Sequence, residues 1–133
     1  MIGLDTNVLI RLFVDEPDGR QTAAARALFR ETAETTLRIS LIVLVESVWT
    51  LRSRFAVGRT GIATFLAHLL DHPRFDLEAR DCVEAAFEAF ATQRADFADC
   101  LIEALNVRAG ASATFTFDRA AAAARNHFRL VPA

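Results

Sequence analysis

Five acidic residues lie where predicted strands end or inside predicted helices: Asp5, Glu46, Asp96, Asp99 and Asp118. In α/β folds, ligands gather beyond the carboxyl ends of the strands, so Asp5 and Asp118, each after an apolar segment, are expected to face one crevice. Carboxylates crowded together raise one another's pKa unless a cation neutralises them. An all-oxygen ligand set suits Mg²⁺ or Mn²⁺ better than Zn²⁺. Such sites serve phosphodiester hydrolysis, because the metal acidifies an attacking water and stabilises the phosphate.

Each of these acids also has an ordinary structural interpretation. Asp5 and Asp118 each precede a predicted helix and could be its N-cap. Asp96 is placed to cap the next helix, with Asp99 in the first turn, where the helix dipole favours negative charge. Asp99 is harder to explain in this way, because it lies one turn from Glu103, a repulsive pair without a cation. Asp96 therefore stays divided between metal ligand and helix cap.

Glu46 stands out because its neighbours on the predicted helix are apolar. At three and four positions from it lie Ile42, Val43, Trp49 and Thr50. An ionised carboxylate buried without a partner on such a face is strongly unfavourable. We therefore expect Glu46 to have a raised pKa, an arginine partner or a divalent metal ion as its partner.

The basic residues exclude several mechanisms and leave one surface open. All 15 basic residues are arginine, so mechanisms that need a lysine, such as the P-loop phosphate clamp, are excluded. The net charge of −2 argues against a protein that coats nucleic acid non-specifically. Residues 47–70 contain arginines and no acid, which predicts a modest basic surface. Location alone suggests Arg11, Arg52 and Arg54 as substrate contacts.

The elements that must position these acids alternate along the chain. Short apolar strands separated by longer helices predict an α/β fold with a mainly parallel sheet. At 133 residues the chain fits a single domain, residues 1–133, and no segment resembles a linker. The strands are predicted at residues 2–5, 37–39, 75–77, 113–117 and 128–131. The helices are predicted at residues 6–14, 41–55, 61–70, 78–92 and 97–109. A further helix, rich in alanine and arginine, is predicted after the break at residues 15–19 and ends at about residue 34, and a short alanine-rich helix is predicted after residue 118. Ser40 is the expected N-cap of the helix from residue 41.

Hydropathy and cysteine usage concern the compartment and the assembly. The mean hydropathy is +0.24, but the longest apolar stretch, residues 41–51, is too short to span a bilayer. Excess apolar surface in a small domain favours an oligomer interface, so we expect a dimer or a tightly held partner and no membrane contact. No secretory signal is recognised at the start, and two cysteines without a CxxC pattern predict reduced thiols. The expected compartment is the cytoplasm.

Four segments of the chain match a known pattern in the right order. The segments MIGLDTNVLIRLF, LIVLVESVW, ADFADCLIEAL and TFTFDRAA resemble those of the PIN-domain ribonucleases. The most similar branch is the VapC-type toxins of bacterial toxin–antitoxin pairs. The likeness covers essentially the whole chain, including its small size.

The resemblance implies a PIN-like three-layer α/β/α sandwich with a short, mainly parallel central sheet. It implies Mg²⁺- or Mn²⁺-dependent cleavage of RNA, homodimerisation and inhibition by a cognate antitoxin, as in type II toxin–antitoxin systems. The acids matching the family's catalytic metal site are Asp5, Glu46, Asp99 and Asp118, and Asp96 matches an extra acid of one variant. The resemblance also implies that neighbouring side chains orient these ligands: Thr6, Asn7 and Thr116.

Two other functions remain in view. A catalytically degenerate PIN fold would bind RNA or a partner without cutting, although idle clustered carboxylates are costly to keep. A haloacid-dehalogenase-like phosphatase would also begin with an Asp at a strand end, but it needs Asp-x-Asp and a lysine. Here Asn7 lies two positions after Asp5, and the chain has no lysine.

Overall fold

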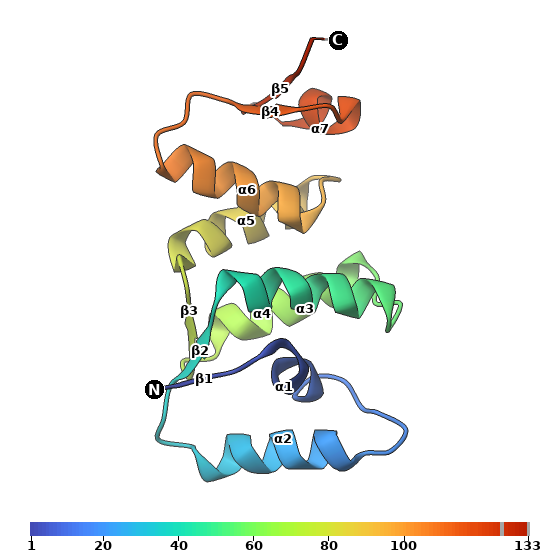
Figure 1. Cartoon of the computed structure of the whole chain (residues 1–133), viewed down its shortest axis with the longest axis vertical. Coiled ribbons are helices and arrows are strands. Elements are labelled where there is room, and N and C mark those ends of the chain that lie inside the picture. The colour runs from blue at the N-terminus through green and yellow to red at the C-terminus, as the bar shows by residue number, and fades with distance from the viewer. Residues whose placement is uncertain (126, 133) are drawn as a thin grey trace. The chain divides into compact units, whose positions relative to one another are not determined.

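The structure is a computed structural model that describes residues 1–125 and 127–132. The chain divides into two compact units, an N-terminal unit, Met1–Glu78, and a C-terminal unit, Ala79–Ala133. Figure 1 traces the chain through both units.

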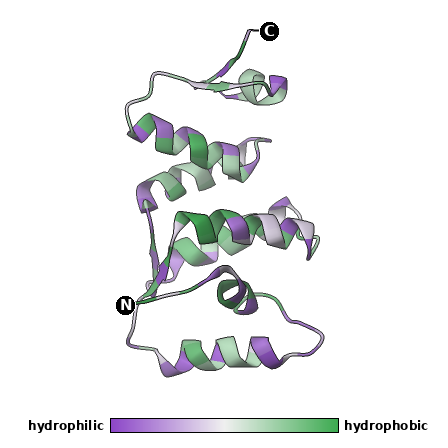
Figure 2. Ribbon diagram, in the orientation of Figure 1, coloured by the Kyte–Doolittle hydropathy of each residue, from purple (hydrophilic) through white to green (hydrophobic). Residues whose placement is uncertain are grey.

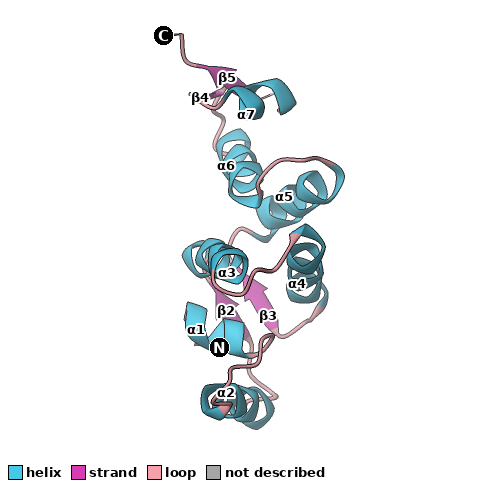
Figure 3. Cartoon of the chain, turned by 90° about the vertical axis from the view of Figure 1, so that its right-hand side faces the viewer, coloured by secondary structure: helices cyan, strands magenta, loops and turns pink. Residues whose placement is uncertain are grey.

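The described part of the N-terminal unit holds a three-stranded parallel sheet in the order β1-β2-β3. Parallel strands need crossover connections, and each crossover here contains two helices. The strands are β1 (Ile2–Gly3), β2 (Leu37–Ile39) and β3 (Phe75–Leu77), and the helices are α1 (Thr6–Arg11), α2 (Arg20–Glu31), α3 (Leu41–Ser53) and α4 (Arg59–Asp71). Figure 3 shows β2 and β3 lying among these helices.

Alternation along the strands separates core from surface. In β2, Leu37 and Ile39 are buried, while Arg38 between them pairs with Asp76 of β3 across the sheet, 2.8 Å between Nη1 and Oδ2. This follows from the two-residue period of a strand. Helices complete the core, and the hydrophobic first half of α3 is visible in Figure 2. The most deeply buried apolar side chains on the helices of this unit are Leu9, Ile10, Leu44, Leu51, Ile62, Leu66 and Leu69.

The carboxyl ends of β2 and β3 meet at the start of α3. Ser40 caps this helix, as predicted, by accepting a hydrogen bond from the Val43 amide at 3.3 Å. Glu78, which follows β3, accepts a second bond from the Leu41 amide at 2.8 Å. Two otherwise unpaired amide donors of α3 are therefore satisfied at this sheet edge.

The C-terminal unit begins with a packed helix pair, α5 (Arg80–Thr92) and α6 (Phe97–Arg108). Their shared core includes Cys82, Val83, Phe90, Phe97 and Leu101. The chain then forms β4 (Thr114–Thr116), α7 (Arg119–Ala124) and β5 (Phe128–Leu130), and β4 pairs with β5 in parallel.

The predicted α/β fold with a short, mainly parallel sheet is confirmed, because every strand pairing in the described residues is parallel. In the part of the chain that the structure describes, the five predicted strands form two sheets, of three and two strands, where one central sheet was expected. Two helices, α1 and α2, end about three residues earlier than predicted. Helix α1 stops at Arg11, and the Phe13 ring, beyond it, packs edge-on against Phe65 at 5.0 Å. Helix α2 stops at Glu31. The Arg74 guanidinium donates to the carbonyl of the next residue, Thr32, at 2.6 Å, and so takes the place of the amide donor that a further helical turn would supply. None of the described helices is long and apolar enough to cross a bilayer.

Candidate functional site

The five acids predicted from the sequence fall into two groups, one in each unit. The N-terminal group is Asp5 and Glu46, and the C-terminal group is Asp96, Asp99 and Asp118.

Asp5 follows β1 and is the N-cap of α1. Its Oδ1 accepts a hydrogen bond from the Val8 amide at 3.0 Å, and the side chain is exposed. The structural interpretation of Asp5 as a helix cap is therefore correct. The cap occupies one of the two carboxylate oxygens, so capping and metal ligation by the other oxygen are compatible.

Thr6 connects Glu46 to the first turn of α1. The buried Thr6 hydroxyl donates a hydrogen bond to Oε1 of Glu46, and α1 packs against α3, which carries Glu46. Glu46 is thus held beside the residue that follows Asp5. Within this unit the structure brings the two acids of the N-terminal group to neighbouring elements.

The expectation that Glu46 is buried is wrong. Glu46 is exposed, and the two large side chains flanking it are exposed as well, Ile42 by 79% and Trp49 by 65%. The core face of α3 is formed instead by residues such as Leu44 and Val48. Because α3 is apolar on both faces, apolar neighbours do not reveal which face is buried.

Asn7 and Asp5 lie beside a groove of the N-terminal unit. This groove, of about 430 Å³, is lined by residues of α1 and by Gln21, Ala24 and Leu28 of α2. Asn7 is exposed and therefore accessible from solvent. The groove offers polar groups next to the Asp5 carboxylate.

In the C-terminal group, Asp96 occupies the N-cap position of α6, but its side chain accepts no capping hydrogen bond from the described first turn of that helix. Asp99 lies in the first turn and is half-buried. Burial raises the pKa of Asp99, and the negative charges of Asp96 and Asp118 raise this pKa further, while Arg125 lowers it. Asp96 and Asp118 are therefore each close enough to Asp99 to repel its negative charge, which is the behaviour predicted for neighbouring carboxylates.

Asp118 is held by both its side chain and its backbone. Its Oδ1 accepts from the amides of Ala120 at 2.9 Å and Ala121 at 3.2 Å, which makes it the N-cap of α7. Its own amide donates to the Thr116 hydroxyl at 3.0 Å. Thr116 therefore fixes the backbone at the end of β4 that carries Asp118.

Comparison with known families identifies the fold. The sequence model of the family described as PIN domain matches residues 2–126. The chain belongs to the PIN domain family. No curated protein matches the chain. PIN domains are in general nucleases, a class of hydrolases, and generally use divalent metal ions. The matched segment includes all five candidate acids.

The donor chemistry of this PIN domain fits a hard divalent cation. Within residues 1–125 and 127–132, no three His, Cys, Asp or Glu side chains converge tightly enough to hold a metal ion. The available donors of both groups are carboxylates, the ligands preferred by Mg²⁺ and Mn²⁺. The repulsion that raises the pKa of Asp99 is the kind that a divalent cation relieves.

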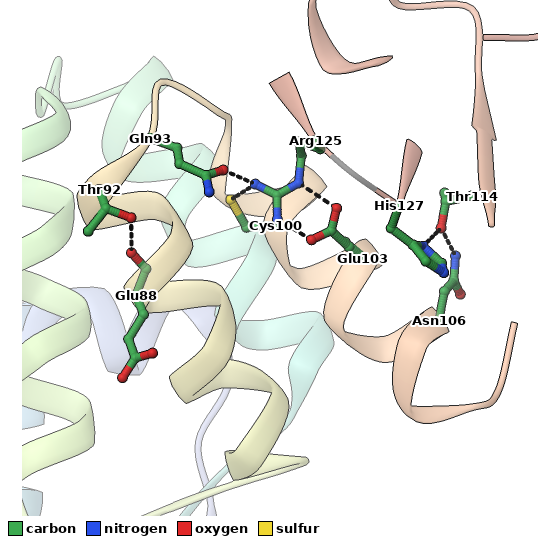
Figure 4. A network of polar contacts seen from close by, with 9 residues as sticks. All are labelled: Glu88, Thr92, Gln93, Cys100, Glu103, Asn106, Thr114, Arg125 and His127. Atoms are coloured by element: carbon green, nitrogen blue, oxygen red, sulfur yellow. Dashed lines mark hydrogen bonds and ion pairs between the residues drawn. The ribbon is translucent and has the colours of Figure 1, made fainter. Parts of the chain in front are cut away.

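Sequence reasoning missed Arg125. Glu103 was expected to repel Asp99 without a cation nearby, but Arg125 supplies that cation. Its Nη2 lies 2.6 Å from Oε1 of Glu103 and its Nε lies 2.9 Å from Oε2 (Figure 4). The unexplained acid on α6 was a signal that some arginine must reach it. The sequence does not indicate which arginine this is, because Arg125 and Glu103 are 22 positions apart.

Arg11, suggested by location as a substrate contact, has a structural role instead. Its side chain is buried, forms an ion pair with Glu16 and donates from Nε to Gln21 at 3.3 Å. Arg52 and Arg54 are exposed at the end of α3. The part of the predicted basic surface that lies at the end of α3 is therefore accessible to solvent.

Proposed function

We propose that this PIN domain is a metal-dependent endoribonuclease that hydrolyses RNA phosphodiester bonds. The observation that carries the proposal is the family match over residues 2–126, a segment that contains all five candidate acids. A degenerate PIN fold that only binds RNA or a partner is the alternative. The presence of all five candidate carboxylates favours the enzyme, because two of them, Asp96 and Asp118, raise the pKa of Asp99 beyond the rise that burial causes.

The residues take the following roles in this proposal. The ion is held by Asp5, Glu46, Asp99 and Asp118, with Asp96 as an additional ligand. When bound, Mg²⁺ or Mn²⁺ lowers the pKa of the attacking water and stabilises charge on the phosphate. Thr6 orients Glu46 through its hydroxyl, and Thr116 orients Asp118 through the backbone. Asn7 lies beside Asp5 in the adjoining groove and supports the same ligand set.

The two acidic groups serve one reaction only if the chain forms one domain. We propose that residues 1–133 make up a single PIN domain. Support comes from the family match, which extends from residue 2 to residue 126 and so spans the boundary between Glu78 and Ala79.

The proposed biological role is that of the toxin in a type II toxin–antitoxin pair, acting in the cytoplasm. The resemblance to VapC-type toxins supports this role. Association with a second copy and with an antitoxin is supported by large hydrophobic side chains that are exposed among the described residues: Ile42, Trp49, Ile102, Val107, Phe115, Phe117 and Leu130.

An RNA-cleavage assay tests the enzymatic proposal. The purified full chain is incubated with end-labelled RNA in Mg²⁺, Mn²⁺ or EDTA and compared with Asp5→Ala and Asp99→Ala. Asp81→Ala is the matched control, because Asp81 is an exposed acid whose charge is already paired with Arg108 at 2.9 Å. We expect metal-dependent cleavage by the wild type and by Asp81→Ala only.

Three other results would contradict the proposal. Unchanged cleavage in both site variants would refute the assignment of the acids. RNA binding by the wild type without any cleavage would favour the degenerate module. Turnover of a small phosphomonoester with no cleavage of RNA would favour a phosphatase.

For the toxin role, induced expression should stop growth in the wild type and not in Asp99→Ala, and an antitoxin encoded beside the gene should restore growth.

A further inference from the structure

Two side-chain networks attach the β4–α7–β5 segment to the helix pair of the C-terminal unit. In the Arg125 network, the guanidinium contacts Gln93, Cys100 and Glu103. In the His127 network, the Thr114 hydroxyl lies between Asn106 and His127. Figure 4 shows both networks along α6.

The Arg125 network is buried and directed at several partners. The Arg125 side chain is 4% exposed, and Nη1 donates to Oε1 of Gln93 at 2.9 Å and to Sγ of Cys100 at 3.2 Å. Both oxygens of Glu103 accept from the same guanidinium, at 2.6 and 2.9 Å. Such a two-point contact fixes orientation as well as distance, because the guanidinium is planar.

Charge is maintained in this buried position. Burial alone lowers the pKa of Arg125, but the hydrogen bond and the charge of Glu103 outweigh it and raise that pKa overall. The guanidinium therefore stays positively charged beside the acidic cluster. Its charge also opposes the rise in the pKa of Asp99.

The position of Arg125 relates two of the acids. Glu103 lies one turn after Asp99 on α6, so a group fixed to Glu103 is fixed relative to Asp99. Arg125 is the C-cap of α7, and Asp118 is the N-cap of the same helix. The contact between Arg125 and Glu103 thus joins the helix that carries Asp99 to the helix that Asp118 caps.

We propose that Arg125 is a positioning residue of the active site. By clamping Glu103, it fixes the Asp99 and Asp118 carboxylates relative to one another so that both can bind the same divalent ion. This inference rests on the proposed function. Arg125 itself acts through Glu103 and does not contact the ion or the RNA.

The His127 network provides a matched control. Asn106 Nδ2 donates to the Thr114 hydroxyl at 3.0 Å, and the same hydroxyl lies 2.8 Å from Nδ1 of His127. Asn106 follows Asp99 by seven residues, about 10 Å along the helix. Thr114→Val therefore weakens the same attachment at a place remote from the acids.

The test measures Mn²⁺ binding by calorimetry and thermal unfolding by circular dichroism on the full chain. The proteins are wild type, Arg125→Gln, Arg125→Lys and Thr114→Val. We expect Arg125→Gln to weaken Mn²⁺ binding by about 10- to 100-fold, the range found when residues that orient metal ligands are removed. Lysine keeps the charge but not the two-point contact, so Arg125→Lys should bind with intermediate affinity. Thr114→Val should lose stability and keep wild-type affinity.

Unchanged Mn²⁺ affinity in folded Arg125→Gln would overturn the inference, and so would an equal loss of affinity in Thr114→Val. If Arg125→Gln does not fold, Arg125→Lys decides in the same way, since weaker binding supports positioning and wild-type binding refutes it. Failure of the proposed function is a separate result. It would appear in the wild type, which would then neither bind Mn²⁺ nor cut RNA, and the inference would fall with it.

Discussion

Replacing Glu103 by glutamine leaves the Arg125 guanidinium buried without its counter-ion. Removing one partner of a buried ion pair destabilises a protein by about 3–5 kcal/mol, because the remaining charge is left uncompensated. Arg125 is 4% exposed, which favours a large effect, but Glu103 is 21% exposed and glutamine keeps one acceptor oxygen. We therefore expect the lower end, about 3 kcal/mol. For a chain of this length that corresponds to a fall in Tm of about 10 °C.

The matched control is Glu84→Gln, because Glu84 pairs with Arg80 on the surface of α5, where the two side chains are 54% and 44% exposed. Exposed pairs of this kind contribute less than about 1 kcal/mol. Urea unfolding followed by circular dichroism gives the free energy of unfolding from the midpoint at constant slope. Equal and small losses in both variants would refute the argument that Arg125 is a buried charge held by Glu103.

Three further predictions follow from the same structure. Trp49 is the only tryptophan and lies in the N-terminal unit, whereas Glu103 lies in the C-terminal unit. If the chain is one cooperative domain, Glu103→Gln should shift the unfolding midpoint measured by Trp49 fluorescence as far as the midpoint measured by circular dichroism. An unshifted fluorescence midpoint would contradict the single domain. Burial and the charges of Asp96 and Asp118 raise the pKa of Asp99 above 3.8, so the metal-free folded state binds the proton more tightly than the unfolded state, and stability is lost as pH rises from about 4 through the raised pKa. Asp99→Asn should therefore raise the Tm at pH 7 and have no such effect below about pH 4, and a lowered Tm at pH 7 would contradict the raised pKa. Millimolar Mn²⁺ should raise the Tm of the wild type, because an ion at 100 times its Kd stabilises the folded state by about 2.7 kcal/mol. The Tm of Asp5→Ala should rise much less. An equal rise in both proteins would exclude Asp5 as a ligand.

The sequence predicted those features whose signals are local. Ser40, Asp5 and Asp118 each cap the helix that follows them, and β2 and β3 have the predicted bounds, because caps and short apolar strands depend on adjacent residues. The resemblance to the PIN domain family, carried by four motifs, was confirmed by a match over nearly the whole chain.

Features that depend on distant partners were not predictable in the same way. The exposure of Glu46 depends on which face of α3 meets the core, and an apolar pattern on both faces does not specify this. Arg11 was considered a substrate contact from its place near Asp5, but its contacts with Glu16 and Gln21 bury it. The partner of Glu103 lies 22 positions away, and only the tertiary structure reveals it.

The central proposal is that acids from both units serve one metal-dependent ribonuclease site. Asp5→Asn and Asp118→Asn test it most directly, because asparagine keeps an oxygen that can cap α1 or α7 and removes only the negative charge. The measurement is the rate of RNA cleavage in Mn²⁺ by each variant, with circular dichroism to verify the fold. We predict that each substitution alone slows cleavage by more than about 100-fold, beyond the loss typical of residues that only orient ligands. Wild-type cleavage by either folded variant would contradict a site that needs both groups of acids.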